Sequence, residues 1–306
     1  MIHGIINVYK EKGFTSHDVV AKLRGIVGQK KIGHTGTLDP DAVGVLPVCL
    51  GKATKVCELL TDKDKTYETV LLLGQETDTQ DTSGEVLEEK PTDSITEDMV
   101  TEVIKGFLGD YEQIPPMYSA LKVNGKKLYE LAREGKTVER KARKVKIHNI
   151  EIKEIDLPRV RMEVECSKGT YIRTLCHDIG QKLGCGGCME ELKRTKVSCF
   201  ELSDSYTLSE IAELKAEGKL LEILTPIDAM FEQYNKAVVS SKWAPLVYNG
   251  NAVCGKAFAF DSSEKILDKE IVRVYDGDEN FIALYQYDAK KDEYSIIKMF
   301  YSKTDM

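Results

Sequence analysis

Cysteine is scarce in this sequence, with eight residues in 306. Disulfide-stapled secreted domains carry far more cysteine for their length, so the composition excludes that class and favours a reducing compartment. Cys185 and Cys188 form the single C-x-x-C pattern, and no second pair or His-x-x-x-His motif completes the four ligands of a structural zinc site. We interpret the pair as a turn with two small apolar side chains, and we predict no metal.

Long apolar runs are also missing. No uninterrupted stretch approaches the roughly 20 residues of a membrane-spanning helix, and residues 1–20 lack the basic and apolar regions of a secretory signal. Hydrophobic residues make up 42% of the chain and charged residues 30%, which permits a large buried core. We therefore expect a soluble, cytoplasmic protein that does not interact with membranes, with a monomer as the default state.

A general excess of positive charge, the simplest signature of nucleic-acid binding, is absent, since the formal net charge is −7. The charges are nevertheless segregated along the chain. Carboxylates dominate residues 75–98, whereas a single carboxylate, Glu139, accompanies the cations Lys136, Arg140, Lys141, Arg143, Lys144 and Lys146. A phosphate backbone would be attracted to the second stretch, although a solvated protein surface can carry the same charges.

Hydrophobic periodicity predicts helices mixed with strands in the first three quarters of the chain. We expect helices at residues 19–27, 53–60, 96–107, 171–183 and 208–224, and strands at 67–73, 145–155 and 159–167. After Asp228, short β-like runs alternate with turn sequences, at residues 237–240, 257–260, 271–275, 281–287 and 295–300. This pattern predicts an α/β or α+β main domain followed by a small β-rich domain, with a boundary near residues 229–237.

The most unusual segment is residues 31–55, where Gly33, Gly36, Gly44 and Gly51 punctuate an apolar run. We expect a partly buried loop that turns repeatedly, and its His, Thr and Asp residues suggest a site. The P-loop, the dinucleotide-binding glycine motif and the zinc-deaminase signature are all excluded by their required spacings. In isolation, Asp39 before a proline would be an ordinary turn residue.

The run GHTGTLDPDAVGVLPVCLGKATK, residues 33–55, resembles the catalytic motif of the TruB family of pseudouridine synthases, in which the aspartate of Leu-Asp-Pro is essential. Other segments resemble further motifs of that family in the same order, at residues 64–67, 74–84, 113–125, 129–135 and 166–174. Together the matches cover about residues 4–230. One departure occurs early, because the family usually has Lys-Pro where this chain has Lys10-Glu11, and this leaves the local loop in doubt.

The resemblance implies the pseudouridine synthase fold, an α+β fold with a central mixed, largely antiparallel sheet flanked by helices. It implies a catalytic domain at residues 1–232, with a thumb-like RNA-binding insertion at about 113–146, and a PUA-like RNA-binding domain at 233–306. The implied activity is isomerisation of uridine-55 in the T-loop of tRNA to pseudouridine, with the base flipped out. The substrate contacts are the T-stem and loop, and no cofactor, guide RNA or obligatory protein partner is expected.

The resemblance assigns catalytic roles to Asp39, Tyr67 and Arg173. Asp39 is the catalytic carboxylate, which attacks C1′, adds to C6 or removes a ribose proton to give a glycal, and the sequence leaves these three routes open. Tyr67 would stack on the extruded uracil, with its hydroxyl near the path of proton transfer. Arg173 would pair with Asp39 and keep it ionised. Without the motifs, Tyr67 would be a plain strand aromatic and Arg173 an ordinary helix-start residue.

Further residues are expected to bind the substrate. Asp81 would pair with the other side of Arg173, His34 would help replace the flipped base, and Tyr171 and Leu192 would wall the pocket. A lone histidine is more often a core or surface residue, so His34 could equally have no chemical role. The residues expected to contact the RNA backbone are Lys122, Lys126, Lys127, Arg133, Arg140, Lys141, Arg143 and Lys144.

Two other functions stay open at this point. One is a tRNA-folding chaperone without catalysis, against which the set Asp39, Tyr67 and Arg173 argues, because a pure binding protein would not need it. The other is the guide-RNA-dependent relative of the dyskerin type, which works inside a ribonucleoprotein. The long thumb-like insertion and the absence of lysine-rich tails favour the stand-alone bacterial form.

Overall fold

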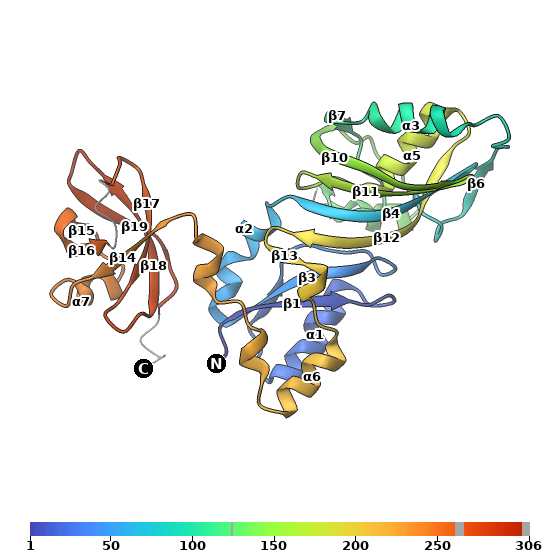
Figure 1. The fold of residues 1–306 in the computed structure, drawn as a ribbon. Helices are drawn as coiled ribbons and strands as arrows, with labels where there is room; N and C mark the ends of the chain where they lie inside the picture. The colour runs from blue at the N-terminus through green and yellow to red at the C-terminus, as the bar shows by residue number, and fades with distance from the viewer. Residues whose placement is uncertain (124, 261–265, 302–306) are drawn as a thin grey trace. The chain divides into compact units, whose positions relative to one another are not determined.

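The structure is a computed structural model that describes residues 1–123, 125–260 and 266–301. It divides into two compact units (Figure 1). The main unit comprises Ile6–Val48 and Cys57–Leu220, and the C-terminal unit comprises Met1–Ile5, Cys49–Val56 and Leu221–Met306. The assignment of residues 1–232 to catalysis and of 233–306 to a PUA-like domain stays a prediction.

The large sheet has nine strands. Seven of them are neighbours in the order β1 (Gly4–Lys10), β3 (Val43–Leu50), β12 (Gly187–Val197), β4 (Lys65–Leu73), β11 (Arg159–Cys166), β10 (Arg143–Asp156) and β7 (Gly109–Gln113). In addition, β2 (Ile32–His34) pairs with β3, and β13 (Phe200–Glu201) pairs with β12. Strands β12, β4, β11, β10 and β7 pair antiparallel, whereas β12 and β3 pair parallel. The predicted mixed, largely antiparallel sheet is confirmed.

Two helices, α3 (Glu97–Lys105) and α5 (Ile172–Leu183), pack against this sheet and against each other (Figure 1). Val100 and Ile104 of α3 and Leu175 and Ile179 of α5 are fully buried in one apolar cluster with the sheet. The side chain of Thr96 accepts a hydrogen bond from the backbone of α3, and Gly184, in the left-handed region at φ 78°, ends α5. These caps explain why the predicted helices at 96–107 and 171–183 form almost where expected.

Two helix predictions need correction. The helix expected at residues 208–224 is wrong in its second half, because α6 (Leu208–Ala216) ends before Gly218, which has a φ of 77°. A short 3₁₀ turn, η3 (Leu220–Ile223), follows. The helix expected at 53–60 is the 3₁₀ segment η1 (Gly51–Val56) and the short helix α2 (Cys57–Thr61). Helix α1 (Ser16–Val27) begins three residues before the predicted start, because Thr15 and Asp18 form a capping box, and it packs on α6.

Residues 114–142 leave the large sheet as an insertion, because Gln113 at the end of β7 pairs with Arg143 at the start of β10. The insertion contains β8 (Lys122–Val123), β9 (Lys126–Lys127) and α4 (Leu128–Arg133). A separate hairpin of β5 (Gln75–Thr77) and β6 (Val86–Glu89) carries the acidic stretch. A 3₁₀ turn, η2 (Leu202–Asp204), follows β13.

The C-terminal unit is rich in β-structure, which confirms that prediction. Its six-stranded sheet has the order β15 (Val253–Cys254), β19 (Glu293–Met299), β18 (Phe281–Asp288), β17 (Ile271–Tyr275), β14 (Asn235–Val239) and β16 (Phe258–Phe260). Its core contains Val274, Ile282 and Tyr285. The remaining elements are η4 (Ile227–Phe231), α7 (Ala244–Tyr248) and η5 (Gly255–Ala257). Within the described ranges, no helix combines the length and the apolar character that crossing a membrane requires.

Candidate active site

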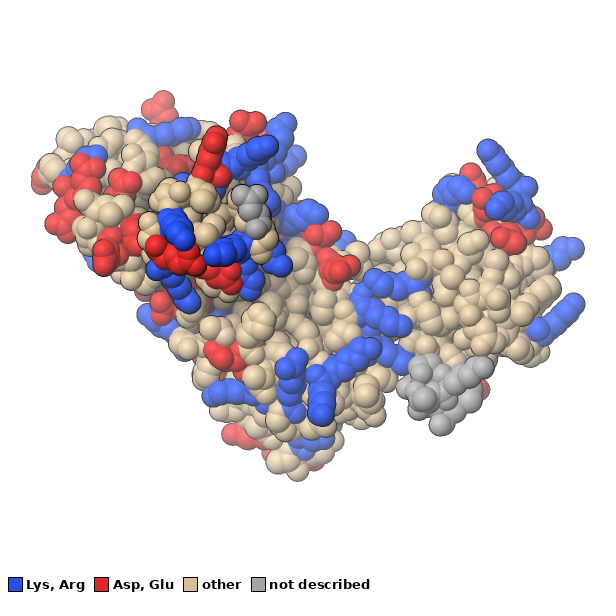
Figure 2. Space-filling view, turned by 180° about the vertical axis from the view of Figure 1, so that it is seen from behind, with Lys and Arg blue, Asp and Glu red and all other residues tan. Residues whose placement is uncertain are grey.

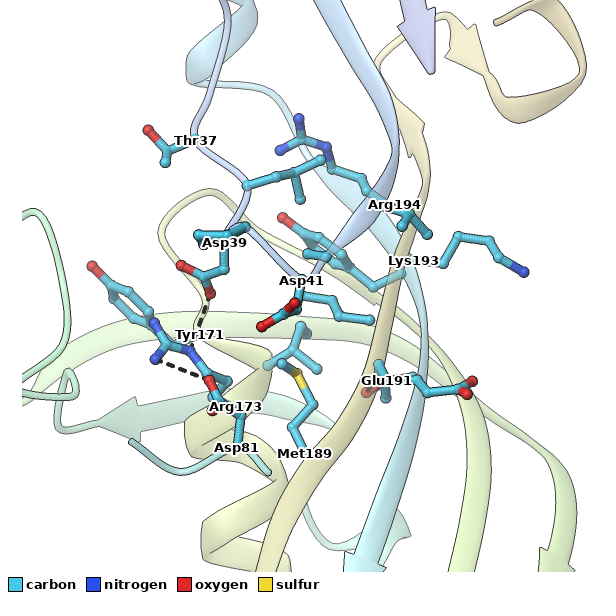
Figure 3. Close-up of a pocket in the computed structure, with 18 of the residues that line it drawn as sticks. Thr37, Asp39, Asp41, Asp81, Tyr171, Arg173, Met189, Glu191, Lys193 and Arg194 are labelled. Carbon is cyan, nitrogen blue, oxygen red and sulfur yellow. Dashed lines mark hydrogen bonds and ion pairs between the residues drawn. The ribbon is translucent and has the colours of Figure 1, made fainter. Parts of the chain in front are cut away.

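The main unit contains a cavity of about 1230 Å³. It brings together side chains that are far apart in the sequence, because β12 and β4 are neighbours in the sheet and the loops of residues 36–42 and 79–83 meet at the start of α5 (Figure 3). Of the predicted catalytic and substrate-binding residues, the cavity is lined by Asp39, Tyr67, Asp81, Tyr171, Arg173 and Leu192. Each of the motifs named in the sequence analysis therefore contributes to the cavity wall, although His34 itself does not.

Buried groups fix the position of the loop that carries Asp39. The backbone N–H of Leu38 donates to Ser16 Oγ of α1 (2.9 Å), and the Leu38 side chain is buried. On the other side of Asp39, the carbonyl of Pro40 accepts from Lys10 Nζ (3.0 Å) and from the Gly13 N–H (2.9 Å). The Asp39 side chain itself stays 43% exposed. The loop is thus fixed while its carboxylate remains open to a substrate.

Arg173, in the first turn of α5, joins three separate parts of the site. Its Nε lies 3.2 Å from Asp39 Oδ2, and its Nη1 lies 3.4 Å from Asp81 Oδ2 (Figure 3). The guanidinium also donates to the carbonyls of Thr79 (3.1 Å) and Tyr118 (2.8 Å). Only 7% of the side chain is exposed. A buried arginine of this kind fixes the orientation of its carboxylate partners through charge-assisted hydrogen bonds.

Both carboxylate oxygens of Asp81 have partners in this network. Its Oδ1 accepts hydrogen bonds from Thr79 Oγ1 (2.7 Å), the Ser83 N–H (3.0 Å) and Ser83 Oγ (2.5 Å), while its Oδ2 faces Arg173. Its carboxylate oxygens are therefore occupied by the loop and by the arginine. Asp39 is the carboxylate of the pair that remains available for chemistry.

Burial raises the pKa of Asp39 above its ordinary value, while the neighbouring Arg173 opposes the rise and Asp81 adds to it. A raised pKa makes the carboxylate more basic than that of a solvent-exposed aspartate, and Arg173 still favours the ionised form. This balance suits a group that must be ionised and also reactive as a nucleophile or base.

Tyr171 and Leu192 line the cavity, and their contact with the substrate stays a prediction. Tyr171 precedes α5, and its backbone is bracketed by the buried side chain of Gln113, which donates to the Tyr171 carbonyl (2.9 Å) and accepts from its N–H (2.8 Å). Leu192 is half-buried on β12, next to the core cluster. Gln113 therefore ties the base of the insertion to the start of the helix that carries Arg173.

His34 does not line the cavity that the described residues form. Its ring packs edge-on against His17, with 5.3 Å between the ring centroids, and its Nδ1 accepts from the Gly36 N–H (3.3 Å). Burial lowers the pKa of His34, and so does the neighbouring His17. Its expected role in replacing the flipped base stays a prediction.

The predicted RNA-backbone cations lie on or beside the insertion. Two of these cations, Lys127 and Arg140, are half-buried. The other six are exposed, namely Lys122, Lys126, Arg133, Lys141, Arg143 and Lys144. Arg140 Nη1 donates to the Pro115 carbonyl (3.1 Å), and Lys144 pairs with Asp110 (3.2 Å). Figure 2 shows that lysine and arginine side chains mix with carboxylates on the surface. The roles of these cations in RNA binding stay predictions.

Two buried cations at the site were missed by the sequence analysis. Lys10 is fully buried, and its pKa is lowered to about 8 by burial, although the charge of Asp39 opposes the shift. Arg194 is 1% exposed and lies directly opposite Tyr67 in the β12–β4 pairing. Lys10 ends the apolar strand β1 and precedes Glu11 and Lys12, so its sequence context carried little sign that it is buried. For Arg194 the signal was weak, because residues 187–197 were not recognised as a strand.

Among the residues that the structure describes, no group of three or more His, Cys, Asp or Glu side chains could hold a metal ion. Cys185 and Cys188 are buried free thiols, and burial raises the pKa of both. Buried thiols of raised pKa are unreactive.

Family models match most of the main unit. Residues 24–172 match the N-terminal domain of TruB family pseudouridylate synthase, and residues 173–232 match the tRNA pseudouridylate synthase B C-terminal domain. A protein of Lachnoclostridium phytofermentans named tRNA pseudouridine synthase B is 54% identical over 98% of this chain and 100% of its own length. A protein of the same name from Clostridium tetani is 44% identical over 97% and 99%.

Solved structures agree with the sequence relatives. A chain in an H/ACA ribonucleoprotein bound to a substrate RNA containing 2′-deoxyuridine superposes with a TM-score of 0.72 and 26% identity, covering 98% of this chain and 86% of that one. A chain in a Cbf5–Nop10–Gar1 complex gives 0.72 and 28% with the same coverage. The chain belongs to the TruB family of pseudouridylate synthases and is an isomerase.

Proposed function

We propose that this enzyme converts uridine-55 in the T-loop of tRNA to pseudouridine, without a guide RNA, and that Asp39 is its catalytic carboxylate. The observation that carries the proposal is the Asp39–Arg173 pair, in which a buried guanidinium holds a carboxylate that is open to a cavity of about 1230 Å³. The relatives named tRNA pseudouridine synthase B, at 44–54% identity over nearly the whole chain, support tRNA as the substrate.

The target uridine must leave its stack before Asp39 can reach its C1′ or C6, at a cost of a few kcal/mol. The cavity has room for a nucleotide, and Tyr67 and Tyr171 line it with aromatic surface. Stacking on such rings stabilises a flipped base by about 1–3 kcal/mol. Binding energy from the rest of the RNA offsets the remainder.

Asp39 then acts on the sugar or on the base. Attack at C1′ expels uracil from the ribose, addition at C6 holds the base while the glycosidic bond breaks, and removal of a ribose proton gives a glycal. Each route needs an ionised carboxylate, and Arg173 supplies the positive charge that favours it. None of them needs a redox step, because uridine and pseudouridine are isomers.

Exposed cations of the insertion support binding of the T-stem and loop. Lys122, Lys126 and Lys141 are exposed there, Arg143 is exposed at the adjoining start of β10, and Arg133 reaches the cavity lining. Phosphate contacts of this kind give affinity and salt dependence, while the folded shape of the RNA selects the site. The acidic hairpin β5–β6 would repel phosphates and direct the RNA away from it.

Release of tritium from tRNA transcribed with C5-tritiated uridine tests the proposal. Formation of the C5–C1′ bond expels the C5 hydrogen, so the purified protein alone should release one equivalent per tRNA. Replacement of uridine-55 by cytidine should abolish the release. Full release from that variant tRNA would show that uridine-55 is not the target. No release from folded protein that binds tRNA would show that the protein alone does not modify bare tRNA.

A guide-dependent activity is the second candidate. The likeness to chains in H/ACA and Cbf5 complexes, with a TM-score of 0.72, favours it. The identity to those chains is 26–28%, against 54% to the Lachnoclostridium relative. Turnover of bare tRNA in the absence of other proteins and RNAs would decide for the stand-alone enzyme. A third possibility, a non-catalytic tRNA chaperone, predicts that Asp39→Asn leaves every measurable function unchanged.

A further inference from the structure

The site contains a buried cation without a carboxylate partner. Arg194, on β12, is 1% exposed, and its Nε donates to the Val45 carbonyl (2.7 Å) while its Nη2 lies 3.4 Å from the Gly36 carbonyl. Among the described residues, no carboxylate acts on the charge of Arg194, and Tyr67 is the titratable group beside it. A buried guanidinium without a carboxylate is costly, so its retention points to another use.

The side chain that Arg194 meets is Tyr67. The two residues are direct partners in the antiparallel pairing of β12 with β4, so their side chains lie on the same face of the sheet. The charge of Arg194 favours the ionised form of its cross-strand partner Tyr67. Tyr67 is 9% exposed, and both residues line the cavity that also contains Asp39. A permanent positive charge thus lies beside a phenol in the active-site wall.

We propose that Arg194 is a positioning residue that orients Tyr67 toward the flipped uracil and stabilises the negative charge of its ionised oxygen before that oxygen takes the C5 proton. This inference rests on the proposed function, in which Tyr67 touches the target base. It adds a second arginine to the site, with a partner and a task different from those of Arg173.

The proton transfer starts from a base that is not bonded to the enzyme at C6. After the C5–C1′ bond has formed, C5 is tetrahedral and still carries its hydrogen. The ionised oxygen of Tyr67, whose own proton has gone to solvent, takes that hydrogen as a proton. The C5–H electron pair becomes the C5–C6 double bond, the C6–N1 π pair moves to N1, and N1 gains a proton from solvent.

The charges around Tyr67 show what Arg194 contributes. Burial raises the pKa of Tyr67, Arg194 opposes the rise, and Cys166 of β11 and Asp39 add to it. Three other cations face Arg194 from neighbouring elements, namely Lys10 of β1, His34 of β2 and Lys65 of β4. Burial lowers the pKa of each, to about 8 for Lys10 and Lys65, and the charge of Arg194 lowers it further. Arg194 is the cation whose charge opposes the rise in the pKa of Tyr67.

Arg194 also supports the catalytic loop, and a test must separate the two roles. The carbonyls of Gly36 and Val45, on either side of Asp39 in the sequence, both accept from its guanidinium. Loss of this support would lower the rate at every pH. Loss of charge stabilisation at Tyr67 would instead move the pH at which the rate rises, because it changes the fraction of ionised phenol.

The experiment is the pH dependence of the single-turnover rate of tritium release, at saturating enzyme, for wild type, Tyr67→Phe, Arg194→Lys and Arg194→Gln. We expect the rising limb to move to higher pH by about 1–3 units in Arg194→Gln, and by less in Arg194→Lys, which keeps a charge. Fluorinated tyrosine at position 67 ionises more readily than tyrosine, so it should restore the neutral-pH rate of Arg194→Gln. If Arg194→Gln does not fold, the same fluorotyrosine series in Arg194→Lys carries the test.

The possible results distinguish a failure of the inference about Arg194 from a failure of the proposed function. A rate lowered equally at every pH in the Arg194 variants, without rescue by fluorotyrosine, would overturn the inference and leave the proposed function standing, provided that Tyr67→Phe is slow. A Tyr67→Phe variant with the wild-type rate would remove Tyr67 from the chemistry and overturn the inference with it. Circular dichroism and tRNA affinity would show that each variant is folded.

Discussion

Arg173 and Asp39 form an ion pair of unequal exposure, with Nε 3.2 Å from Oδ2 and side chains that are 7% and 43% exposed. The arginine is fixed by three further acceptors from two loops, while the carboxylate faces the cavity. Such an arrangement pre-orients a reactive group, so that little reorganisation is needed when the substrate arrives.

Replacing Asp39 by Asn should abolish turnover and preserve tRNA binding. Loss of a central catalytic carboxylate lowers the rate by about 10⁴-fold or more, while the amide keeps the shape of the side chain. Tritium release and filter binding would measure the two effects. Near wild-type release from the variant would contradict the assignment of Asp39.

Asp41→Asn is the matched control. Asp41 lines the same cavity two residues away, and it is exposed and forms no ion pair with Arg173 among the described residues. We expect this variant to keep most of the activity. Equal losses in the two variants would mean that the overall negative charge of the loop, and not the Asp39 carboxylate, is what the reaction needs.

The Asp39→Asn variant should melt at a temperature no lower than that of the wild type at pH 7. The pKa of Asp39 is raised in the folded protein, so the folded state holds the proton more tightly than the unfolded chain does. Its ionisation therefore lowers stability as the pH rises from the ordinary aspartate value through the folded one. The gain on substitution should be small, because the side chain is 43% exposed. Calorimetry at pH 4 and pH 7 would check the sign.

The acid limb of the pH–rate profile should move to higher pH when Arg173 loses its charge. Activity requires ionised Asp39 and falls as the pH drops through its pKa, which Arg173 holds down against burial and Asp81. An Arg173→Met variant should therefore show a lower rate and an acid limb about 1–3 units higher. Single-turnover rates between pH 5 and pH 9 would reveal it, and a limb that stays in place would show that Arg173 does not tune Asp39.

Removal of exposed charge from the insertion should weaken tRNA binding and flatten its salt dependence. Substituting Lys122, Lys141 and Arg143 with Gln should lower the slope of log affinity against log salt by about 2–3, because each phosphate contact contributes slightly less than one unit. The single-turnover rate at saturating enzyme should change little. Affinity measured at several salt concentrations tests this.

A triple substitution of Lys105 on α3, Lys153 near the far end of β10 and Lys215 on α6 with Gln removes the same net charge away from the insertion and serves as the control. It should leave the salt slope nearly unchanged. Similar slopes for the two triple variants would refute a specific phosphate-binding role for the insertion.

Gly44→Ala should destabilise the protein far more than Gly13→Ala. Both glycines have positive φ, 104° and 86°, so both substitutions cost backbone strain of about 1–2 kcal/mol. At Gly44 a Cβ would lie 2.2 Å from the carbonyl oxygen of Arg194, whereas at Gly13 nothing lies within 4 Å. The clash adds about 1–3 kcal/mol. Urea unfolding of both variants would measure the difference, and equal losses would contradict the close approach of β3 and β12.

The sequence predicted the helices and strands whose signals are local. Thr96 and Gly184 mark the ends of helices in the sequence itself, and α3 and α5 form almost where they were expected. The strands β4, β10 and β11 followed from their β-branched and alternating residues. The segment of residues 31–55, expected as a loop, contains β2 and β3. Its glycines reflect close packing of strands, as Gly44 against Arg194 illustrates, and not only turns.

The sequence by itself determined the local elements around the site, and through the residues 33–55 motif it singled out Asp39 as the candidate reactive carboxylate. Only the tertiary structure decided that Lys10 donates to the Pro40 carbonyl and that Arg194 faces Tyr67. Both contacts depend on strand order and register, which bring residues 30 and 127 positions apart into one buried place. The free energy of a buried charge depends on all of its neighbours at once, and no local pattern in the sequence records them.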